Sequence, residues 1–200
     1  KKGNAIAVWA QNHKFGPGLN DYTASIFANR FDADKFAATG KGWGTPSPID
    51  ANDAFQANSP QVVFNGNDNA IVVWGQTAVN GKFDSIYANY FDALQYANSG
   101  NGWLGAELIE LDETGSASLP QVAVDTSNNA MVAWAQGYPD GFGSEFYGIS
   151  ANYYRAAQGG WVGAKRIDDN TTGTAYASGT VRIAFDPSGN AIAVFVYNLN

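Results

Sequence analysis

The segment Asn4-Ala-Ile-Ala-Val-Trp-Ala-Gln11 decides the fold, because the chain repeats it at a nearly constant spacing. It returns as Asn69-Ala-Ile-Val-Val-Trp-Gly-Gln76 and as Asn129-Ala-Met-Val-Ala-Trp-Ala-Gln136, and a fourth copy reads Asn190-Ala-Ile-Ala-Val-Phe-Val-Tyr197. The large ring of this unit moves from position 9 to 74, 134 and 195, so successive spacings are 65, 60 and 61 residues. Self-similarity at a fixed period indicates a repeat architecture.

Three other units recur in the same phase. One precedes each later copy, at 60–64, 120–124 and 180–185, and another follows, at 25–32, 85–92 and 148–155. A Gly-Trp pair comes next, at 42–43, 102–103 and 160–161, and leads to an Ile-acid pair at 49–50, 109–110 and 167–168. Short runs of Val, Ile, Ala and aromatic residues bounded by Gly, Asn, Asp or Pro predict β-strands. We designate the four strands of each repeat A, B, C and D, strand B being the Asn-Ala-Ile unit.

The pattern of strand B indicates how the sheets pack. The segments 65–68, 125–128 and 186–189 are rich in Asn, Asp and Gly, which predicts a tight hairpin between strands A and B. Strand B is apolar on both faces, as expected when four-stranded sheets pack face to face around an axis. No window carries an amphipathic stripe long enough to predict a helix.

The predicted fold is therefore all-β, a single region of β-propeller blades that are four-stranded antiparallel sheets. The repeat units run approximately over 1–58, 59–118, 119–178 and, incompletely, 179–200. Propellers close with about four to eight blades, so these repeats make an incomplete ring. We expect the remaining blades in a longer chain, the reading we favour, or a homo-oligomer whose copies complete the ring.

Composition excludes several functions. With 11 Lys and Arg against 18 Asp and Glu, the net charge of −7 disfavours nucleic acid and anionic membrane surfaces as partners. No apolar run is long enough for membrane insertion. The chain has no Cys and one His, which excludes disulfides and metal sites built from several His or Cys ligands. No cofactor is expected; Ca²⁺ on oxygen ligands at the turns 65–69, 125–129 or 186–190 is the one metal that the composition accommodates.

The recurring order of Gly-Asn-Ala-hydrophobic-Ala-Val-Trp-x-Gln, Ile-x-Ala-Asn-aromatic and Gly-Trp resembles the tandem blades of extracellular bacterial β-propeller repeat proteins. It is more distantly similar to sialidase-like and lectin propellers. The resemblance implies a secreted protein in an extracellular, periplasmic or cell-surface location. The sialidase box Ser-x-Asp-x-Gly-x-x-Trp is missing from the hairpin turns, and the four arginines occupy different repeat positions, so sialidase activity is not expected.

The candidate ligand site lies in the connections between strands B and C, whose length varies between repeats. Loops of uneven length on a regular scaffold tend to carry function. Tyr rings beside carboxylates suit a sugar, because rings stack on its apolar faces and carboxylates bind its hydroxyls. The candidates are His13, Asp21, Tyr22, Tyr138, Asp140, Glu145 and Tyr147.

Two repeated features are expected to be structural. The tryptophans of strand B and of the Gly-Trp pairs recur so regularly that we predict them in the core. Asn29, Asn89 and Asn152 are expected to make one structural hydrogen bond in each blade.

Three functions remain open. The leading hypothesis is a non-enzymatic binding or adhesion module that recognises a glycan or a protein through the B–C loops. The first alternative is a carbohydrate-active hydrolase or lyase that uses loop carboxylates, although no spacing selects a catalytic pair. The second alternative is a structural, self-assembling repeat protein.

Overall fold

The computed structural model describes residues 3–14, 16–18, 22–50, 55–78, 81–111, 114–139, 145–169, 175–177 and 181–199, and the statements below concern these residues. No helix in these ranges is long and apolar enough to span a membrane.

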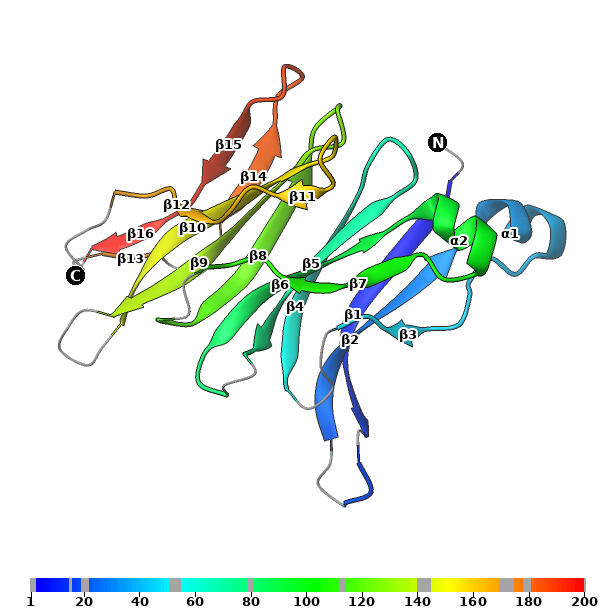
Figure 1. Ribbon diagram of the computed structural model, residues 1–200, viewed down its shortest axis with the longest axis horizontal. Coiled ribbons are helices and arrows are strands. Elements are labelled where there is room, and N and C mark those ends of the chain that lie inside the picture. Colours follow the sequence, from blue (N-terminus) through cyan, green and yellow to red (C-terminus); the bar gives the residue numbers. More distant parts are fainter. Residues whose placement is uncertain are drawn as a thin grey trace.

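The strands form antiparallel sheets that follow one another along the chain and lie side by side like a fan (Figure 1). Sheet 1 contains β1 (Ala5–Lys14), β2 (Tyr22–Phe31) and β3 (Ser47–Pro48). Sheet 2 contains β4 (Ala57–Phe64), β5 (Ala70–Thr77), β6 (Asp84–Phe91) and β7 (Trp103–Leu108). Sheet 3 contains β8 (Ala117–Val124), β9 (Ala130–Pro139), β10 (Glu145–Arg155), β11 (Gly160–Trp161) and β12 (Lys165–Arg166).

The last repeat supplies β14 (Arg182–Phe185) and β15 (Ala191–Val194), which pair as sheet 4. A separate pair joins β13 (Ala175–Ala177) to β16 (Tyr197–Leu199). Sheet 2 has the strand order β4-β5-β6-β7, which is the A-B-C-D order of the sequence repeat. The chain is thus an all-β protein built from β-propeller blades.

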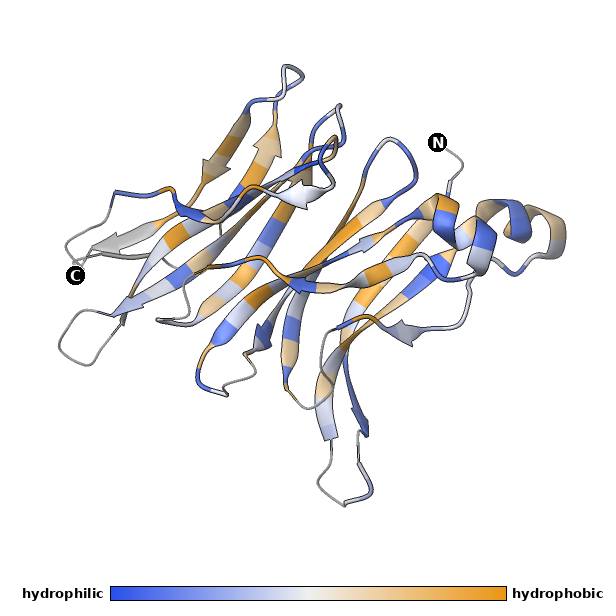
Figure 2. Ribbon diagram, in the orientation of Figure 1, coloured by the Kyte–Doolittle hydropathy of each residue, from blue (hydrophilic) through white to orange (hydrophobic). Residues whose placement is uncertain are grey.

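The hydrophobic core consists of the contacts between successive sheets, visible as orange bands on the strands (Figure 2). The first core cluster joins Ile6 and Ile26 of sheet 1 to Val72 and Trp74 of sheet 2. The next two clusters repeat it in register between sheets 2 and 3 and between sheets 3 and 4. Strand B is therefore apolar on both faces because each face packs against a different neighbouring sheet.

Two of the three recurring Asn residues of strand C connect neighbouring sheets, as the sequence predicts, whereas Asn29 Oδ1 has no hydrogen-bond partner among the described residues. Asn89 Nδ2 donates to the Ile49 carbonyl of sheet 1 at 2.9 Å, and Asn152 Nδ2 donates to the Ile109 carbonyl of sheet 2 at 2.7 Å. Both amides are buried, so these bonds also satisfy polar groups that water does not reach.

The turns between strands A and B use their polar side chains internally. Asp125 Oδ1 accepts from the backbone N–H groups of Ser127 and Asn129, and its Oδ2 accepts from Asn129 Nδ2 at 2.8 Å. Asp186 repeats this arrangement, and the hydrogen bonds from Asn190 hold the pKa of the Asp186 carboxyl below its usual value. These bonds account for the turn composition, and no group of three or more His, Cys, Asp or Glu residues that could hold a metal ion occurs among the described residues.

Two short helices lie between strands C and D, where the sequence predicted none. The helices α1 (Ala33–Thr39) and α2 (Ala93–Ser99) follow Asp32 and Asp92, whose carboxylates accept from the backbone N–H groups of the first turn. Each ends at a glycine with positive φ, Gly40 at 72° or Gly100 at 76°, as at a left-handed helix cap. The third repeat has Arg155 in place of the capping Asp and forms only a turn over 156–159.

The tryptophans divide into two groups, which corrects part of the sequence prediction. Trp74 and Trp134 on strand B are completely buried, as predicted. Trp43, in the Gly-Trp pair of sheet 1, is 51% exposed instead of buried, and Trp9, Trp103 and Trp161 are only partly buried. The same position in sheet 3 shows why: the Trp161 indole N–H reaches back to Glu107 of the preceding sheet at 2.8 Å, a contact that needs a neighbour on that side.

Candidate functional site

The two ends of the sheets differ in what they carry. The A–B turns and both helices lie at one rim, at the top of Figure 1, and the B–C connections lie at the opposite rim. The strand-D segments that end in Ile-acid also run toward this second rim, because Ile109 is hydrogen-bonded to Ile86 near the start of strand C. We call it the B–C rim.

A small cavity opens at the B–C rim between sheets 2 and 3. Its volume is about 190 Å³. Its lining combines an aromatic wall with polar and cationic groups, and consists of Leu111, Trp134, Gln136, Tyr138, Ser150, Ala164, Lys165 and Arg166. The volume is below the range of about 300–1,000 Å³ typical of drug-sized ligands, so the cavity suits a single sugar ring.

The cavity exists because sheet 3 departs from the repeat. In sheets 1 and 2 the strand-B Trp stacks on an aromatic residue of strand C: Trp9 on Phe27 and Trp74 on Tyr87, both with ring centroids 6.2 Å apart. In sheet 3 the residue opposite Trp134 is Ser150. Removing one ring of the stack leaves space beside Trp134, and this space forms part of the cavity.

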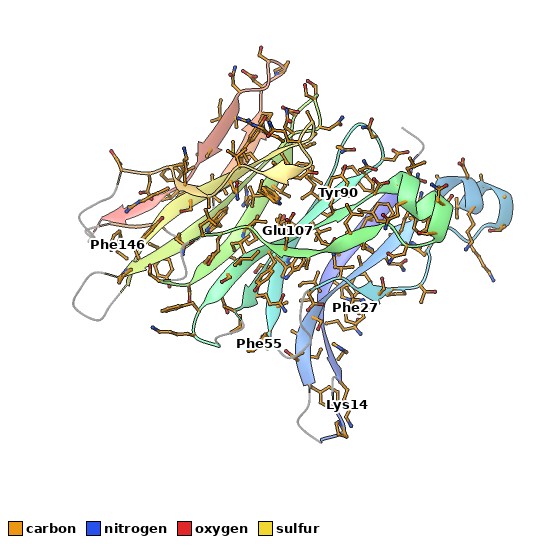
Figure 3. All side chains as sticks on the ribbon, in the orientation of Figure 1. Lys14, Phe27, Phe55, Tyr90, Glu107 and Phe146 are labelled. Carbon is orange, nitrogen blue, oxygen red and sulfur yellow. The ribbon has the colours of Figure 1, made fainter. Side chains whose placement is uncertain are left out.

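Arg166 lies in an aromatic and acidic environment. Its guanidinium carbon is 4.5 Å from the ring centroid of Tyr138 and 5.3 Å from that of Phe146. Phe146 lies at the start of β10 and is labelled in Figure 3. Its Nε forms an ion pair with Asp168, whose side chain is fully buried. A cation–π contact of this kind contributes about 0.5–1 kcal/mol, so it helps to hold the guanidinium in one orientation.

Asp168 reaches this position because of a glycine. Its second oxygen accepts from the Ile149 backbone N–H. A Cβ at Gly148 would collide with that oxygen, and the equivalent positions in sheets 1 and 2 are Ser25 and Ser85. Gly148 thus leaves room for the Asp168 carboxylate that orients Arg166, whereas in sheet 2, beside Ser85, the equivalent Glu110 accepts from the Ile86 N–H at 3.4 Å.

Hydrogen bonds position the remaining polar groups. The hydroxyls of Tyr138 and Ser150 are 2.8 Å apart, and the Trp134 indole N–H donates to Gln136 Oε1 at 2.8 Å. Gln136 in turn donates to the Gly115 carbonyl at 3.2 Å. The cavity is thus lined by side chains whose rotamers are held by neighbours, which is the condition for a precise binding site.

The structure separates the seven residues predicted from the sequence. Tyr138 lines the cavity, while Tyr147 lies on the opposite face of β10 and packs on the core between sheets 3 and 4. His13 and Tyr22 belong to sheet 1; the His13 ring meets the edge of Phe27 at 5.7 Å, and Tyr22 is 58% exposed. Asp21 and Asp140 lie outside the described residues, and of Glu145 only the backbone is described, opposite Pro139.

Ser150, Arg166 and Asp168 were not predicted as site residues. The signal of Ser150 and Arg166 was present as departures from the repeat, whereas Asp168 is the acid of the repeated Ile-acid pair. Ser150 stands where the other repeats have Phe27 and Tyr87, and Arg166 stands where they have Pro48 and Leu108. A search for positions at which one repeat differs from the others would have found Ser150 and Arg166.

Comparison with known proteins identifies the fold. No protein-family model matches the chain, and no curated protein matches its sequence. A solved structure of the GH93 α-L-arabinofuranosidase of Fusarium graminearum with arabinobiose matches 94% of this chain with a TM-score of 0.50 and 10% identity. A mutant of the α-L-arabinofuranosidase from the same organism, bound to an iminosugar inhibitor, matches 97% of this chain with a TM-score of 0.50 and 10% identity. The chain spans 53% of the length of each, so about half.

These matches correct the leading functional hypothesis. The sequence favoured a non-enzymatic binding or adhesion module, whereas the solved structures that share the fold are those of arabinofuranosidases. At 10% identity the likeness itself shows the fold, which is that of a β-propeller.

Proposed function

We propose that this chain is part of a carbohydrate-active hydrolase and that the cavity between sheets 2 and 3 binds one sugar ring of its substrate. The observation that carries the proposal is the break in the repeat at Ser150, Arg166 and Gly148. These changes leave space for a cavity at the B–C rim and place a cationic side chain in its lining. On a regular repeat scaffold, functional residues are expected where one blade departs from the repeat.

The cavity suits a neutral sugar. The Tyr138 ring offers apolar surface to a sugar face, and Lys165 and Arg166 offer hydrogen-bonding groups to hydroxyls. Asp168 is occupied by Arg166 and by the Ile149 N–H, so its role is to position Arg166 rather than to exchange protons. Arabinofuranosides are the first substrates to test, because they are the substrates of the enzymes that share the fold.

The catalytic carboxylates are proposed to come from the B–C connection of the third repeat, which follows the cavity-lining residue Tyr138 in the sequence. Glycoside hydrolysis uses a pair of carboxylates about 5–5.5 Å apart for retention or about 6.5–9.5 Å apart for inversion. The connection from Tyr138 to Phe146 contains two acidic residues, Asp140 and Glu145. We further propose that the protein acts outside the cell, where polymeric glycans are accessible.

The test is hydrolysis of a panel of 4-nitrophenyl glycosides that includes the α-L-arabinofuranoside, using the full chain. We expect one or more glycosides to be cleaved, and we expect Asp140→Asn and Glu145→Gln each to reduce kcat at least about 100-fold, the lower end of what one acid–base group contributes. Asp34→Asn is the matched control, because Asp34 is an exposed carboxylate in α1 at the opposite rim. A folded chain that cleaves nothing in the panel, or whose activity survives both substitutions, contradicts the proposal.

A further inference from the structure

A second and larger hollow lies between sheets 1 and 2. Its volume is about 560 Å³, about three times the 190 Å³ of the cavity between sheets 2 and 3. Sheet 1 contributes residues 28–30 and 44–48, and sheet 2 contributes Phe91, Tyr96 and residues 100–103. We call it the C–D groove, because these residues belong to strands C and D and their connections. None of them lines the cavity, so the groove is a separate site.

The corresponding place between sheets 2 and 3 is filled by side chains. Tyr90 of sheet 2 and Tyr154 of sheet 3 stack with ring centroids 5.8 Å apart. The Trp161 indole N–H donates to Glu107 at 2.8 Å. These four residues line a space of only about 10 Å³. The repeat therefore closes this place when its aromatic and acidic side chains are present.

Two replacements in sheet 1 keep the groove open. Arg30 stands where sheet 2 has Tyr90, and Ser47 stands where it has Glu107. Trp103, in the Gly-Trp pair of sheet 2, therefore lacks the carboxylate that its counterpart in sheet 3 binds. Its indole N–H has no hydrogen-bond partner among the described residues. The groove thus contains an unused donor on a partly exposed aromatic residue.

The charge in the groove is balanced within the first repeat. Arg30 Nη1 pairs with Asp32 at 2.8 Å, and the guanidinium carbon lies 4.7 Å from the ring centroid of Tyr96. With these contacts the Arg30 side chain is only 16% exposed. No other Lys, Arg, Asp or Glu among the described residues lines the groove. The lining therefore favours a neutral ligand over an anion or a cation.

The polar groups of the lining favour a sugar over a proline-rich peptide. Thr45, Ser47 and Asn101 provide hydroxyl and amide groups that donate and accept hydrogen bonds, as sugar hydroxyls also do. Proline residues have no backbone N–H, so a proline-rich segment would leave the acceptors of the groove without partners. The Trp103 ring adds an apolar surface on which a sugar face can stack.

We propose that the C–D groove is a second glycan site, which binds about two or three rings of a neutral oligosaccharide against Trp103. The Trp103 indole N–H and the hydroxyls of Thr45 and Ser47 bind the sugar hydroxyls. The volume of the groove lies within the range of about 300–1,000 Å³ typical of ligand sites. A role in holding a polymeric substrate rests on the proposed function, whereas the binding itself does not.

The test is isothermal titration calorimetry of the full chain with arabinotriose, xylotriose, cellotriose and maltotriose, and with a polyproline peptide as the competing class. We expect at least one trisaccharide to bind and the peptide not to bind. The titrations are repeated with Ser150→Tyr, which restores the strand-C ring of sheet 2 beside Trp134 and closes the cavity. Binding in the groove should persist in this variant.

Two variants alter the groove itself. Arg30→Tyr combined with Ser47→Glu gives sheet 1 the side chains that sheet 2 has at these positions, and should lower the association constant by about tenfold or more. Trp103→Ala should do the same, because it removes the ring and its donor. Trp43→Ala is the matched control, since Trp43 has the same repeat position and is 51% exposed but does not line the groove. Circular dichroism checks that each variant is folded, and the double variant decides if Trp103→Ala unfolds.

The outcomes separate clearly. Loss of trisaccharide binding in the groove variants, with binding kept in Trp43→Ala and Ser150→Tyr, supports the proposal. A chain that binds no trisaccharide, that binds polyproline instead, or whose binding survives the double variant would overturn it. Binding that Ser150→Tyr abolishes would also overturn it, because the sugar would then occupy the cavity alone. None of these results needs hydrolysis, so a chain that cleaves no glycoside but binds a sugar in the groove contradicts the proposed function only.

Discussion

At the scale of single residues, the Trp-x-Gln pair shows how the repeat satisfies a buried donor. Residues two apart on a strand share a face, so the Trp74 indole N–H reaches Gln76 Oε1 at 3.1 Å within a fully buried environment. A buried indole N–H without a partner would cost about 1–3 kcal/mol. In the fourth copy Phe195 has no N–H, and the Gln is replaced by Tyr197. The Trp and the Gln are lost together in this copy because the Gln accepts the hydrogen bond from the indole N–H.

The same reasoning predicts the effect of restoring the repeat at the cavity. Ser150→Tyr returns the ring that Tyr87 supplies in sheet 2 and places it in the space beside Trp134. We expect the free energy of unfolding to be kept, and any hydrolysis found in the glycoside panel to fall by about tenfold or more as about 1.4 kcal/mol of sugar binding is lost.

Ser150→Ala is the matched control for this substitution. It removes the 2.8 Å hydrogen bond to Tyr138 but leaves the cavity open, so KM should change less than in Ser150→Tyr. Steady-state kinetics and urea denaturation measure both effects. Full activity in Ser150→Tyr would show that the substrate does not use this cavity.

At the scale of elements, the strands were predictable and the helices were not. The B strands combine β-branched residues, apolar character on both faces and flanking turns, so several local signals agree. The helices α1 and α2 have only seven residues each, too few for an apolar stripe, and none of their residues is buried. Their signal was in the caps alone: Asp32 and Gly40, Asp92 and Gly100.

The first of these caps is reinforced electrostatically. The backbone N–H of Lys35 and the guanidinium of Arg30 hold the pKa of the Asp32 carboxyl below its usual value. The third repeat, with Arg155 at this position, cannot accept those N–H bonds and has a turn instead. The third connection is also shorter, since five residues separate Arg155 from Trp161 whereas ten separate Asp32 from Trp43, so the missing cap and the shorter length together account for the turn.

The Gly-Trp pairs that follow these connections look identical in sequence but differ in their packing. A Cβ at Gly102 would lie 2.6 Å from the Phe91 ring and 2.7 Å from the Asp92 carbonyl oxygen, which the helix uses. A Cβ at Gly160 would meet no atom within 4 Å. We expect Gly102→Ala to lower the free energy of unfolding by about 1–3 kcal/mol through overpacking, and Gly160→Ala to change it by less than about 0.5 kcal/mol.

Urea denaturation of the two variants at equal protein concentration measures this difference. Neither glycine has a positive φ, so backbone strain does not enter the comparison. Equal losses in the two variants would mean that the helix connection is not the reason for the glycine.

At the scale of the whole molecule, stability is expected to come from contacts between neighbouring sheets. Each core cluster joins one sheet to the next, as in repeat proteins whose stability is approximately a sum of repeat and interface contributions. The sequence predicted this architecture because strand B is apolar on both faces. It did not predict the cavity, because the lining combines Ser150 and Arg166 of the third repeat with Leu111 of the preceding repeat. A contact across repeats is invisible in the pattern of one repeat.

This view makes a prediction from two isoleucines at one repeat position. Ile71 on β5 is 2% exposed between sheets 2 and 3, and Ile192 on β15 is 62% exposed. Ile71→Ala should lower the free energy of unfolding by about 2–5 kcal/mol, because it leaves a cavity in a completed contact. Ile192→Ala should change it by less than about 0.5 kcal/mol when measured at concentrations where the chain is monomeric. The chemical change and the strand position are the same, so the difference reports the neighbouring sheet alone. A loss in Ile192→Ala as large as that in Ile71→Ala would show that the neighbouring sheet is not the source of the difference in stability between the two positions.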